Sequence, residues 1–436
     1  MRYHKPLQGL YSGKDGIQRP KQSQRVIVSE FANLVAELEE LLENIPGTQN
    51  LRLELGELRR LILEQRAPRF VLVGRRGSGK SSLVNAIFGQ EVAEVGHTKS
   101  QTGRGRWWTY ESELGNIEIL DTRGLQEGSK PEGEDEESSP LESIVASIGE
   151  RLPDAVLFLV KAKEVDAAID ADIDALLNIR RRLKEEHMPI VAVITHVDEL
   201  EPKNVRLHEA EDEDPHDIEE KLKRVQEVQR HLDDKIREHA ELKKDLVAVI
   251  GVSSYMSWKK DGTLRADERW RIEDLVFYLA KELPDEAQVT FARLSRMTRV
   301  QRTIAHRLTN VVSGLCGGIA ATPLPVADIA PITSLQVSLV AGIAYVSGRE
   351  MNVKTAAEFM AAMGLNVGIG YGLREVARAL LKTLALGPGT AASAAIAAAA
   401  TYGIGRAATA YFLDGKTIEE AKSEFEDAKE DGPKTT

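Results

Sequence analysis

The sequence predicts an α/β domain with a mostly parallel sheet, preceded by two helices and followed by an all-helical domain. Between Arg69 and Leu283, short apolar runs alternate with amphipathic helical patterns, which is typical of a sheet wrapped by helices. From Ala287 to Leu413 the composition shifts sharply towards Ala, Gly, Ser and Thr. A chain of 436 residues is also long enough for two or three domains.

Six apolar runs are the expected strands: residues 70–73, 107–110, 117–120, 155–160, 190–194 and 246–250. Only a short polar turn separates the second from the third, so these two should pair antiparallel, whereas helical crossovers join the others. Residues 216–244 indicate one long charged helix with a thin apolar stripe. We expect this helix to lie on the α/β domain with its other faces in solvent. The alternative is that its apolar stripe binds a partner protein.

Local signals outside the sheet divide the rest of the chain. The first helix is expected to begin at Ser29 as its N-cap and to end at Pro46-Gly47, and a second helix should cover residues 51–64. The acidic, turn-rich segment 127–139 should be mobile. The predicted regions are a flexible arm (1–28), N-terminal helices (29–66), the α/β domain (67–284), the helical domain (285–413) and a charged tail (414–436).

Composition excludes several classes of protein. The net charge of -11 argues against a nucleic-acid binder that works through bulk positive charge. The single cysteine, Cys316, excludes an intramolecular disulfide and a cysteine-rich zinc site, and we expect it to pack as a small hydrophobe. The first residues contain no apolar run of signal-peptide length, so we expect the α/β domain to stay in the cytoplasm.

Residues 74–81, GRRGSGKS, match the pattern G-x-x-x-x-G-K-[ST] between an apolar strand and a helix. In such a loop, backbone N–H groups and the helix N-terminus surround phosphate oxygens. Lys80 is expected to reach the β- and γ-phosphates and the Ser81 hydroxyl to ligate Mg²⁺. An ordinary glycine-rich turn is the alternative. The predicted phosphate-binding residues are Arg76, Gly77, Ser78, Gly79, Lys80, Ser81 and Ser82.

A D-x-x-G pattern, Asp121 to Gly124, ends the third expected strand about forty residues after the loop. Ligands of open α/β sheets sit at the carboxyl ends of the strands. We therefore expect Asp121 to hold Mg²⁺, through water, and the Gly124 N–H to sense the γ-phosphate.

Thr195-His196-Val197-Asp198 follows the apolar strand IVAVI and resembles the [NT]-K-x-D guanine motif of GTPases. In that motif the carboxylate accepts both N–H groups of the guanine edge, a donor pair that adenine lacks. Asp198 therefore favours GTP over ATP, and a plain strand-end cap is the alternative. His196 stands where most families have Lys, so nucleotide affinity rather than base choice is in doubt. Ser253 and Ser254, after the strand LVAVIGV, fit the last guanine-contacting position.

Residues 96–104 lie between the loop and D-x-x-G, where a switch segment should close on Mg²⁺ when a γ-phosphate is present. Thr102 is the expected ligand because it falls just before the second strand, and Thr98 is the alternate. The predicted metal ligands are Ser81, Thr102 and Asp121, with Mg²⁺ as cofactor and GTP or GDP as ligand.

These motifs, in this order, resemble the Era-like GTPases of the TrmE–Era–EngA–YihA–septin superfamily over residues 69–283. Gly77 and the following SSLVNAIFG look most like the bacterial YfjP-like and interferon-inducible branches. The resemblance implies a Ras-like α/β fold, Mg²⁺ dependence and GTP hydrolysis, with Lys80, Thr102 and Gly124 as the catalytic set.

Two departures from these relatives imply slow intrinsic turnover. Leu125 follows D-x-x-G where Ras-like proteins carry a water-orienting Gln, and Gly77 replaces the Asn of potassium-stimulated relatives. The missing group would come from a partner, from a second subunit, or from one of the arginines Arg75, Arg76, Arg104 and Arg106.

The C-terminal region carries two further signals. Five arginines recur along one expected helix: Arg293, Arg296, Arg299, Arg302 and Arg307. They could form a basic flank that binds anionic lipid or RNA, or a face that is solvated or paired with acidic residues. Residues 329–348 and 383–405 reach membrane-spanning length but are rich in Ala, Gly, Ser and Thr. A soluble or peripheral bundle and true insertion both stay open.

Residues 322–336, with TPLPVAD followed by SLQ, resemble the signature of the YcjF-type helical domain of unknown function. That domain is often membrane-associated in bacteria. The resemblance therefore implies, for a chain expected to be cytoplasmic, a peripheral or integral position at the inner face of the cell membrane as the alternative to a soluble bundle.

The sequence thus predicts a GTP-driven switch whose helical domain, 287–413, meets a membrane surface or protein partner, with a homodimer through the GTPase domain also considered. A nucleotide-gated scaffold with little hydrolysis is the rival, and an RNA or ribosome-assembly GTPase ranks last. The signal is expected to pass through segment 127–139 and the junction near Leu283.

Overall fold

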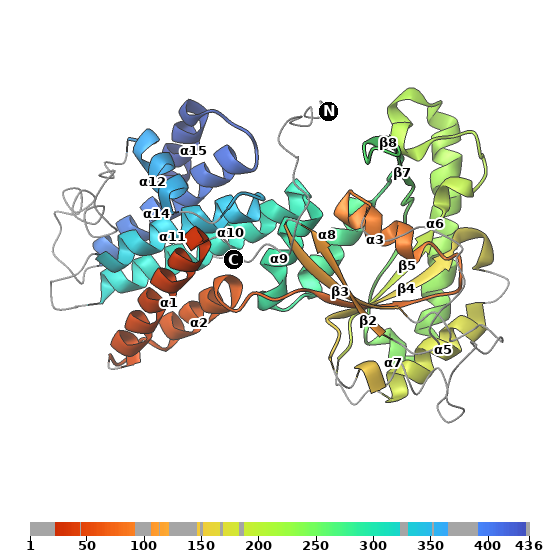
Figure 1. Cartoon of the computed structure of the whole chain (residues 1–436), viewed down its shortest axis with the longest axis horizontal. Coiled ribbons are helices and arrows are strands. Elements are labelled where there is room, and N and C mark those ends of the chain that lie inside the picture. Colours follow the sequence, from red (N-terminus) through yellow and green to blue (C-terminus); the bar gives the residue numbers. More distant parts are fainter. Residues whose placement is uncertain are drawn as a thin grey trace.

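The structure is a computed structural model that describes residues 22–43, 45–91, 106–112, 114–121, 146–148, 151–165, 169–182, 187–322, 330–350, 353–364 and 391–432. The chain forms two lobes, an α/β lobe and a helical lobe, with α8 (Ile272–Glu282) and α9 (Asp285–Ser295) between them (Figure 1). The predicted fold class is confirmed.

All six predicted strands are present in one sheet of order β2-β3-β1-β4-β5-β6. Only β2 runs antiparallel, paired with β3 as expected. β1, β4 and β5 are buried along almost their whole length, which is why they appear in the sequence as continuous apolar runs. The strands are β1 (Arg69–Val73), β2 (Arg106–Ser112), β3 (Gly115–Asp121), β4 (Ala155–Lys161), β5 (Ile190–Thr195) and β6 (Leu246–Gly251).

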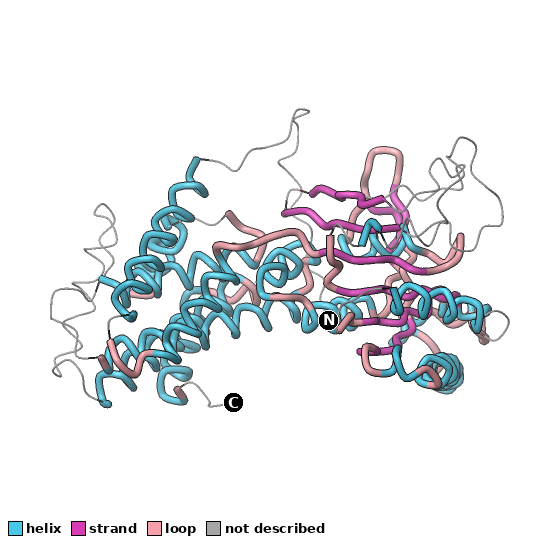
Figure 2. The backbone as a smooth tube through the Cα atoms, turned by 90° about the horizontal axis from the view of Figure 1, so that it is seen from below, coloured by secondary structure: helices cyan, strands magenta, loops and turns pink. Residues whose placement is uncertain are grey.

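Helices cover both faces of this sheet, so a hydrophobic core lies on each face. Alternate residues of one strand point into the two cores. Phe70 and Leu72 of β1 face the core that includes α3 (Lys80–Phe88), α8 and α9. Val71 and Val73 face the other core. The helices of that second core are α5 (Ile169–Arg182), α6 (Pro215–Arg237) and α7 (Ala240–Lys243). The tube view shows the strands of the sheet lying side by side (Figure 2).

The long charged helix ends earlier than predicted. α6 stops at Arg237, and His239, with an extended backbone, begins the short helix α7. The apolar stripe packs on the second core, so the expectation that this helix lies on the domain is confirmed. The hairpin β7 (Met256–Trp258) and β8 (Leu264–Asp267) was not predicted, because its strands are short and contain no buried residue.

The helical lobe contains helices from the N-terminal and the C-terminal parts of the chain. α2 packs on α9 and α10, and α1 packs on α2 and α11. The first helix begins at Gln22, so the prediction of Ser29 as its N-cap was wrong, and residues 22–28 are helical rather than part of a flexible arm. The lobe contains α1 (Gln22–Glu43), α2 (Gln49–Ile62), α10 (Thr298–Ala321), α11 (Ala330–Val346), α12 (Val353–Ala362), α14 (Ala391–Phe412) and α15 (Ile418–Asp431).

The predicted basic helix is not one helix. Arg296 adopts a left-handed conformation, φ 54°, that ends α9 before α10 begins. The arginines on α10 face carboxylates: Arg299 pairs with Asp274 at 2.8 Å and Arg307 with Glu57 at 2.7 Å. Arg293 is buried against the ring of Tyr345. The acid-paired alternative is therefore the one observed for Arg299 and Arg307.

Small residues let the helices of this lobe approach closely. A Cβ added at Gly405 of α14 would lie 2.3 Å from Thr309 Oγ1 on α10, and one at Gly317 would lie 3.1 Å from Ala398 Cβ. Cys316 is fully buried, as expected of a packed small hydrophobe, and burial raises the pKa of its thiol to about 12. Among the described helices, none is long and apolar enough to cross a membrane.

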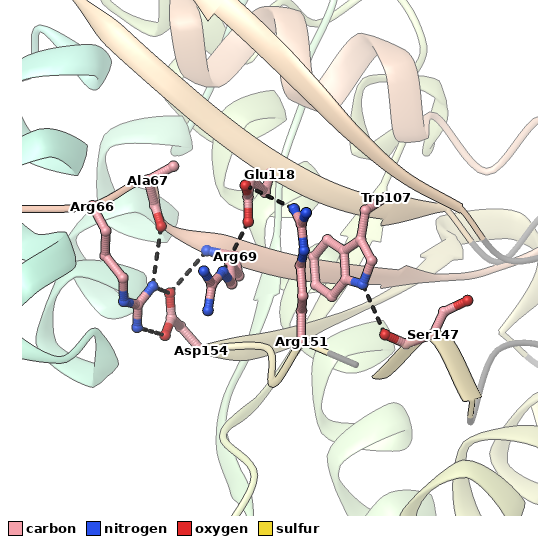
Figure 3. A network of polar contacts seen from close by, with 8 residues as sticks. All are labelled: Arg66, Ala67, Arg69, Trp107, Glu118, Ser147, Arg151 and Asp154. Atoms are coloured by element: carbon pink, nitrogen blue, oxygen red, sulfur yellow. Dashed lines mark hydrogen bonds and ion pairs between the residues drawn. The ribbon is translucent and has the colours of Figure 1, made fainter. Parts of the chain in front are cut away.

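A polar network holds the α2–β1 linker against the sheet (Figure 3). The carboxylate of Asp154, just before β4, accepts bonds from Arg66 at 2.9 and 2.5 Å and from the Arg69 N–H at 2.8 Å. The Arg69 guanidinium donates to Glu118 of β3 at 2.8 Å. The backbone N–H of Arg66 also donates to the carbonyl oxygen of Glu286 of α9 at 2.9 Å. The linker is thus tied both to the sheet and to α9, the helix between the lobes.

The close contact of α10 and α14 makes a testable prediction about stability. Gly405→Ala should destabilise the protein by about 1–3 kcal/mol, because the new methyl overlaps the β-branched Thr309. The control is Gly342→Ala in α11, where a Cβ would meet Ile62 and Leu308 at an ordinary 3.7 Å. That variant should be neutral or gain about 0.5–1 kcal/mol from helix propensity. Thermal and urea unfolding measure both, and equal stability of the two variants would contradict the packing.

Candidate functional site

The glycine loop turns between β1 and α3. Gly77 and Gly79 have φ values of +76° and +85°, a region that favours glycine. Gly79 is the N-cap of α3. Gly74 needs glycine for another reason, because a Cβ there would lie 2.5 Å from the Leu159 carbonyl oxygen. Local sterics therefore account for the glycines of the pattern, and the loop presents its backbone at a helix N-terminus.

Lys80 curls back over the loop. Its Nζ donates to the carbonyl oxygens of Gly74 at 2.6 Å and Arg75 at 3.0 Å, and the side chain is nearly buried. Ser81 and Ser82 follow in the first turn of α3 and are half-buried. The Arg75 guanidinium instead turns to Asp172 of α5, with Nε–O distances of 2.9 and 3.1 Å. Arg76 is exposed.

The predicted guanine motif touches this loop. Thr195, the last residue of β5, is buried, and its Oγ1 donates to the Ser78 carbonyl oxygen at 3.0 Å. His196 has φ 57°, and its Nδ1 lies 2.9 Å from Thr195 Oγ1. If the hydroxyl proton of Thr195 goes to Ser78, its oxygen can accept from a protonated Nδ1, so the direction of this contact follows the tautomer of His196. The glycine loop and the end of β5, which are far apart in the sequence, are thus in direct contact.

Burial is the main reason why the pKa of His196 lies below its ordinary value. The carboxylates of Glu199 and Asp198 act in the opposite direction, and the positive charge of Lys161 lowers the pKa further. At neutral pH the imidazole is therefore uncharged, unlike the lysine that usually occupies this motif position.

Asp198 lies half-buried in the 3-10 turn η2 (Val197–Glu199). Lys221 of α6 holds this turn in place, a role that the sequence analysis did not predict. Its fully buried Nζ donates to the carbonyl oxygens of Asp198 at 2.8 Å, Val205 at 2.7 Å and Pro202 at 3.2 Å. Burial lowers the pKa of Lys221. A signal existed in the sequence: Lys221 lies three residues after Ile218 and four before Val225, on the apolar face of the helix.

Ser253 and Ser254 follow β6 and are buried. Ser253 exchanges backbone hydrogen bonds with Trp270, and Val252 N–H donates to the carbonyl oxygen of Ile194 at 2.8 Å. The two serines therefore follow a residue bonded to the end of β5. The hydroxyl of Ser253 is a buried polar atom without a partner in the described part of the chain, which fits a position kept for a polar ligand.

Asp121 is the last residue of β3, in parallel register with Leu72 of β1. It thus lies at the same edge of the sheet as the loop and Ser81, so the backbone arrangement fits the predicted Mg²⁺ ligands. Thr98, Thr102, Arg104, Gly124 and Leu125 lie outside the described residues, and their roles stay predictions. The side chain of Arg106 is not described either.

A strand, a glycine loop and a helix, beside a second strand that ends in Thr-x-x-Asp, define the α/β lobe as a P-loop GTPase domain with the Ras-like fold. Residues 69–196 match the family model described as 50S ribosome-binding GTPase. Residues 290–431 match a domain of unknown function, DUF697. The chain is thus similar to this GTPase family over residues 69–196 and to DUF697 over residues 290–431.

Curated relatives match in the GTPase domain. GTPase Der of Clostridium tetani is 31% identical over 138 residues, which are 31% of this chain and 29% of the relative. GTPase Der of Bacteroides fragilis is 31% identical over 146 residues, 33% of this chain and 30% of the relative. The chain thus spans under a third of these relatives. They support the predicted superfamily, and the YfjP-like or interferon-inducible branch stays a prediction.

Solved structures give weaker likenesses. A dimerization-deficient mutant of Toc33 from Arabidopsis thaliana has a TM-score of 0.35 at 19% identity, covering 55% of this chain and 94% of that chain. Era in complex with MgGDPNP and nucleotides of 16S ribosomal RNA has a TM-score of 0.32 at 17% identity, covering 62% of this chain and 70% of that chain.

The support given by Lys221 generates a prediction. Lys221→Met keeps the length of the side chain but removes the donor shared by the carbonyl oxygens of Asp198, Pro202 and Val205. The turn that carries Asp198 loses this support, so GDP affinity should fall about tenfold. Lys223→Met, on the exposed face of the same helix, is the control and should bind GDP normally. Fluorescent-GDP titration measures both. Wild-type affinity in Lys221→Met would show that the turn holds its shape without the lysine.

Proposed function

We propose that this protein is a Mg²⁺-dependent GTPase switch that binds GTP between residues 74–82 and Thr195–Asp198 and hydrolyses it to GDP and phosphate. The observation that carries the proposal is the hydrogen bond from Thr195 Oγ1 to the Ser78 carbonyl oxygen at 3.0 Å. Through this bond the first residue of the predicted guanine motif contacts the predicted phosphate loop, which is expected if one nucleotide spans both. The GTPase family match over residues 69–196 supports the same reaction.

The chain's own residues have distinct tasks in this proposal. Backbone N–H groups of the loop and the ammonium of Lys80 hold phosphate oxygens. This requires Lys80 to release the carbonyl oxygens of Gly74 and Arg75, which it contacts at 2.6 and 3.0 Å. The Asp198 carboxylate selects guanine. Ser81, Thr102 and Asp121 would hold Mg²⁺, which neutralises charge on the phosphates when bound.

Turnover is expected to be slow without help. Leu125 has no hydrogen-bonding group with which to orient water, and Gly77 has no side chain. The Arg75 guanidinium is already paired with Asp172 of α5, so Arg75 supplies the missing group only if that pair breaks. A partner or a second copy of the GTPase domain is the better source. Binding without hydrolysis under all conditions would favour a nucleotide-gated scaffold instead.

The β2–β3 hairpin is a route from the nucleotide to the helical lobe. This hairpin follows Thr102 and ends at Asp121, so both predicted switch segments adjoin it. At its turn, a Cβ on Gly115 would lie 3.3 Å from Thr290 of α9. Leu114 approaches Gly348, just after α11, with its Cδ2 3.7 Å from a Cβ built there. This route differs from the one expected through segment 127–139, which lies outside the described residues.

α9 links the same hairpin to the rest of the helical lobe. The Arg293 guanidinium lies 3.9 Å from the centre of the Tyr345 ring of α11, and it donates to the Gly348 carbonyl oxygen at 3.4 Å. A movement of the hairpin would therefore meet a rigid, packed element. We propose that GTP and GDP favour different positions of this hairpin, and that the helical lobe passes the difference to a protein partner or a cytoplasmic membrane face.

Guanine selectivity tests the proposed function. The wild-type protein should bind GTP and GDP well and ATP poorly, and Asp198→Asn should shift preference to xanthine nucleotides, because it replaces an acceptor by a donor opposite the base. Titration with fluorescent GDP, ATP and XDP measures this. Lys80→Ala should abolish tight triphosphate binding with an unchanged circular dichroism spectrum. Equal affinity of the wild type for ATP and GTP would refute the guanine assignment.

The coupling route makes a separate prediction. A GTP analogue should protect α9 and the first turns of α10 from hydrogen exchange more than GDP does, because only the triphosphate orders both switch segments. Leu114→Ala should roughly halve that difference, since it removes a contact of the hairpin with the helical lobe. Leu264→Ala, an exposed leucine in β8, is the matched control. Identical exchange of residues 285–310 in both nucleotide states would mean that the lobes are only tethered.

A further inference from the structure

Lys161 is a cation beside the phosphate loop that no motif predicted. It is the last residue of β4, in parallel register with Thr195 of β5. A Cβ built on Gly77 would lie 3.5 Å from its Nζ and 3.8 Å from its Cε. The ammonium therefore lies next to the middle of the glycine loop, on the side where β4 and β5 end.

The known carboxylate partner of Lys161 holds it only loosely. Its Nζ lies 3.7 Å from Glu164 Oε1, beyond ordinary hydrogen-bond length, and its side chain is one-third exposed. The neighbouring Lys163 differs, because its Nζ donates to Glu199 at 3.0 Å. A loosely paired ammonium can turn to another acceptor at little cost, since an exposed ion pair contributes about 0–1 kcal/mol.

The guanine motif next to Lys161 lacks a cation of its own. His196 occupies the position of the usual lysine and is held neutral by burial, whereas Lys161 is close enough for its charge to act on the imidazole. His196 also contacts the loop, with Cε1 3.2 Å from a Cβ built on Gly79. Lys161 and His196 thus flank Gly77 and Gly79 from two adjacent strands.

We propose that Lys161 is a nucleotide-contacting residue, whose ammonium supplies from β4 the positive charge that this guanine motif lacks at His196. In the bound state it would donate to an oxygen of the guanine nucleotide beside Gly77. The inference rests on the proposed GTP binding. The two residues would then have different roles. The neutral imidazole of His196 packs against the glycine loop, and the ammonium of Lys161 on the neighbouring strand provides the positive charge.

Lys161→Met tests this inference, because methionine keeps the stem and removes the charge. The dissociation constant for fluorescent GDP should rise about tenfold, as expected for the loss of one charged hydrogen bond. Lys161→Arg should recover most of the affinity. Lys163→Met is the control, since it removes a lysine two residues away that is paired with Glu199, and it should leave the GDP affinity unchanged. Unfolding of each nucleotide-free variant should match that of the wild type.

A second substitution distinguishes charge replacement from a purely structural effect. His196→Lys restores a cation at the usual motif position, so in the Lys161→Met background it should recover the GDP affinity. Losses that simply add in the double variant would overturn the proposal. Wild-type GDP affinity in Lys161→Met would overturn it too, while leaving the proposed function intact. A wild-type protein that does not bind GDP would refute the GTPase proposal and this inference together.

Discussion

The contact between the glycine loop and the end of β5 is the constraint on which the arrangement of the site depends. Parallel strands bring their carboxyl ends to one edge of the sheet, so β1, β3, β4 and β5 deliver their terminal residues to the same place. The bond from Thr195 to Ser78 then joins the glycine loop to the first residue of the proposed guanine motif. Glycine at positions 74, 77 and 79 is needed because side chains there would collide or strain the backbone.

Charge around this edge is distributed in an unusual way. Lys80 is buried against loop carbonyl oxygens, and Lys221 is buried below the guanine-motif turn. Both ammonium groups replace water by backbone acceptors, which is how a buried charge remains tolerable. His196 is neutral, while Lys161 stays partly exposed at the end of β4. Lys221 thus only supports the site, whereas Lys80, once it releases the loop, and Lys161 are the charges that we propose to meet the nucleotide.

The two lobes are joined by packing as well as by the chain. α9 lies between them and belongs to the same core as α3, β3 and α10. The linker after α2 is held by Asp154 on the sheet and by Glu286 on α9. In the helical lobe, glycines such as Gly405 allow backbones to approach closely, so the Ala- and Gly-rich composition reflects close helix contact. A change in the β2–β3 hairpin would meet this packed body directly.

The sequence by itself determined the features that depend on neighbouring residues. Continuous apolar runs predicted the strands of the sheet, and the short polar turn after β2 predicted its antiparallel pairing with β3. The glycine pattern predicted a tight turn of the backbone between β1 and α3. The start of α1 was misplaced because Ser29 is a good cap in isolation, whereas the helical pattern continues back to Gln22. Helix ends are decided by weak local energies that tertiary contacts readily outweigh.

Only the tertiary structure decided which distant groups meet. The sequence left open whether the arginines of α10 form a basic flank or an acid-paired face. Their partners Glu57, Asp274 and Asp414 lie on α2, on α8 and after α14. The N-terminal helices joined the C-terminal lobe, and Lys161 and Lys221 came to lie beside the loop and below Asp198. Such pairings join residues tens to hundreds of positions apart, and no local pattern encodes them. They follow from the order of strands in the sheet and from which helix faces are buried.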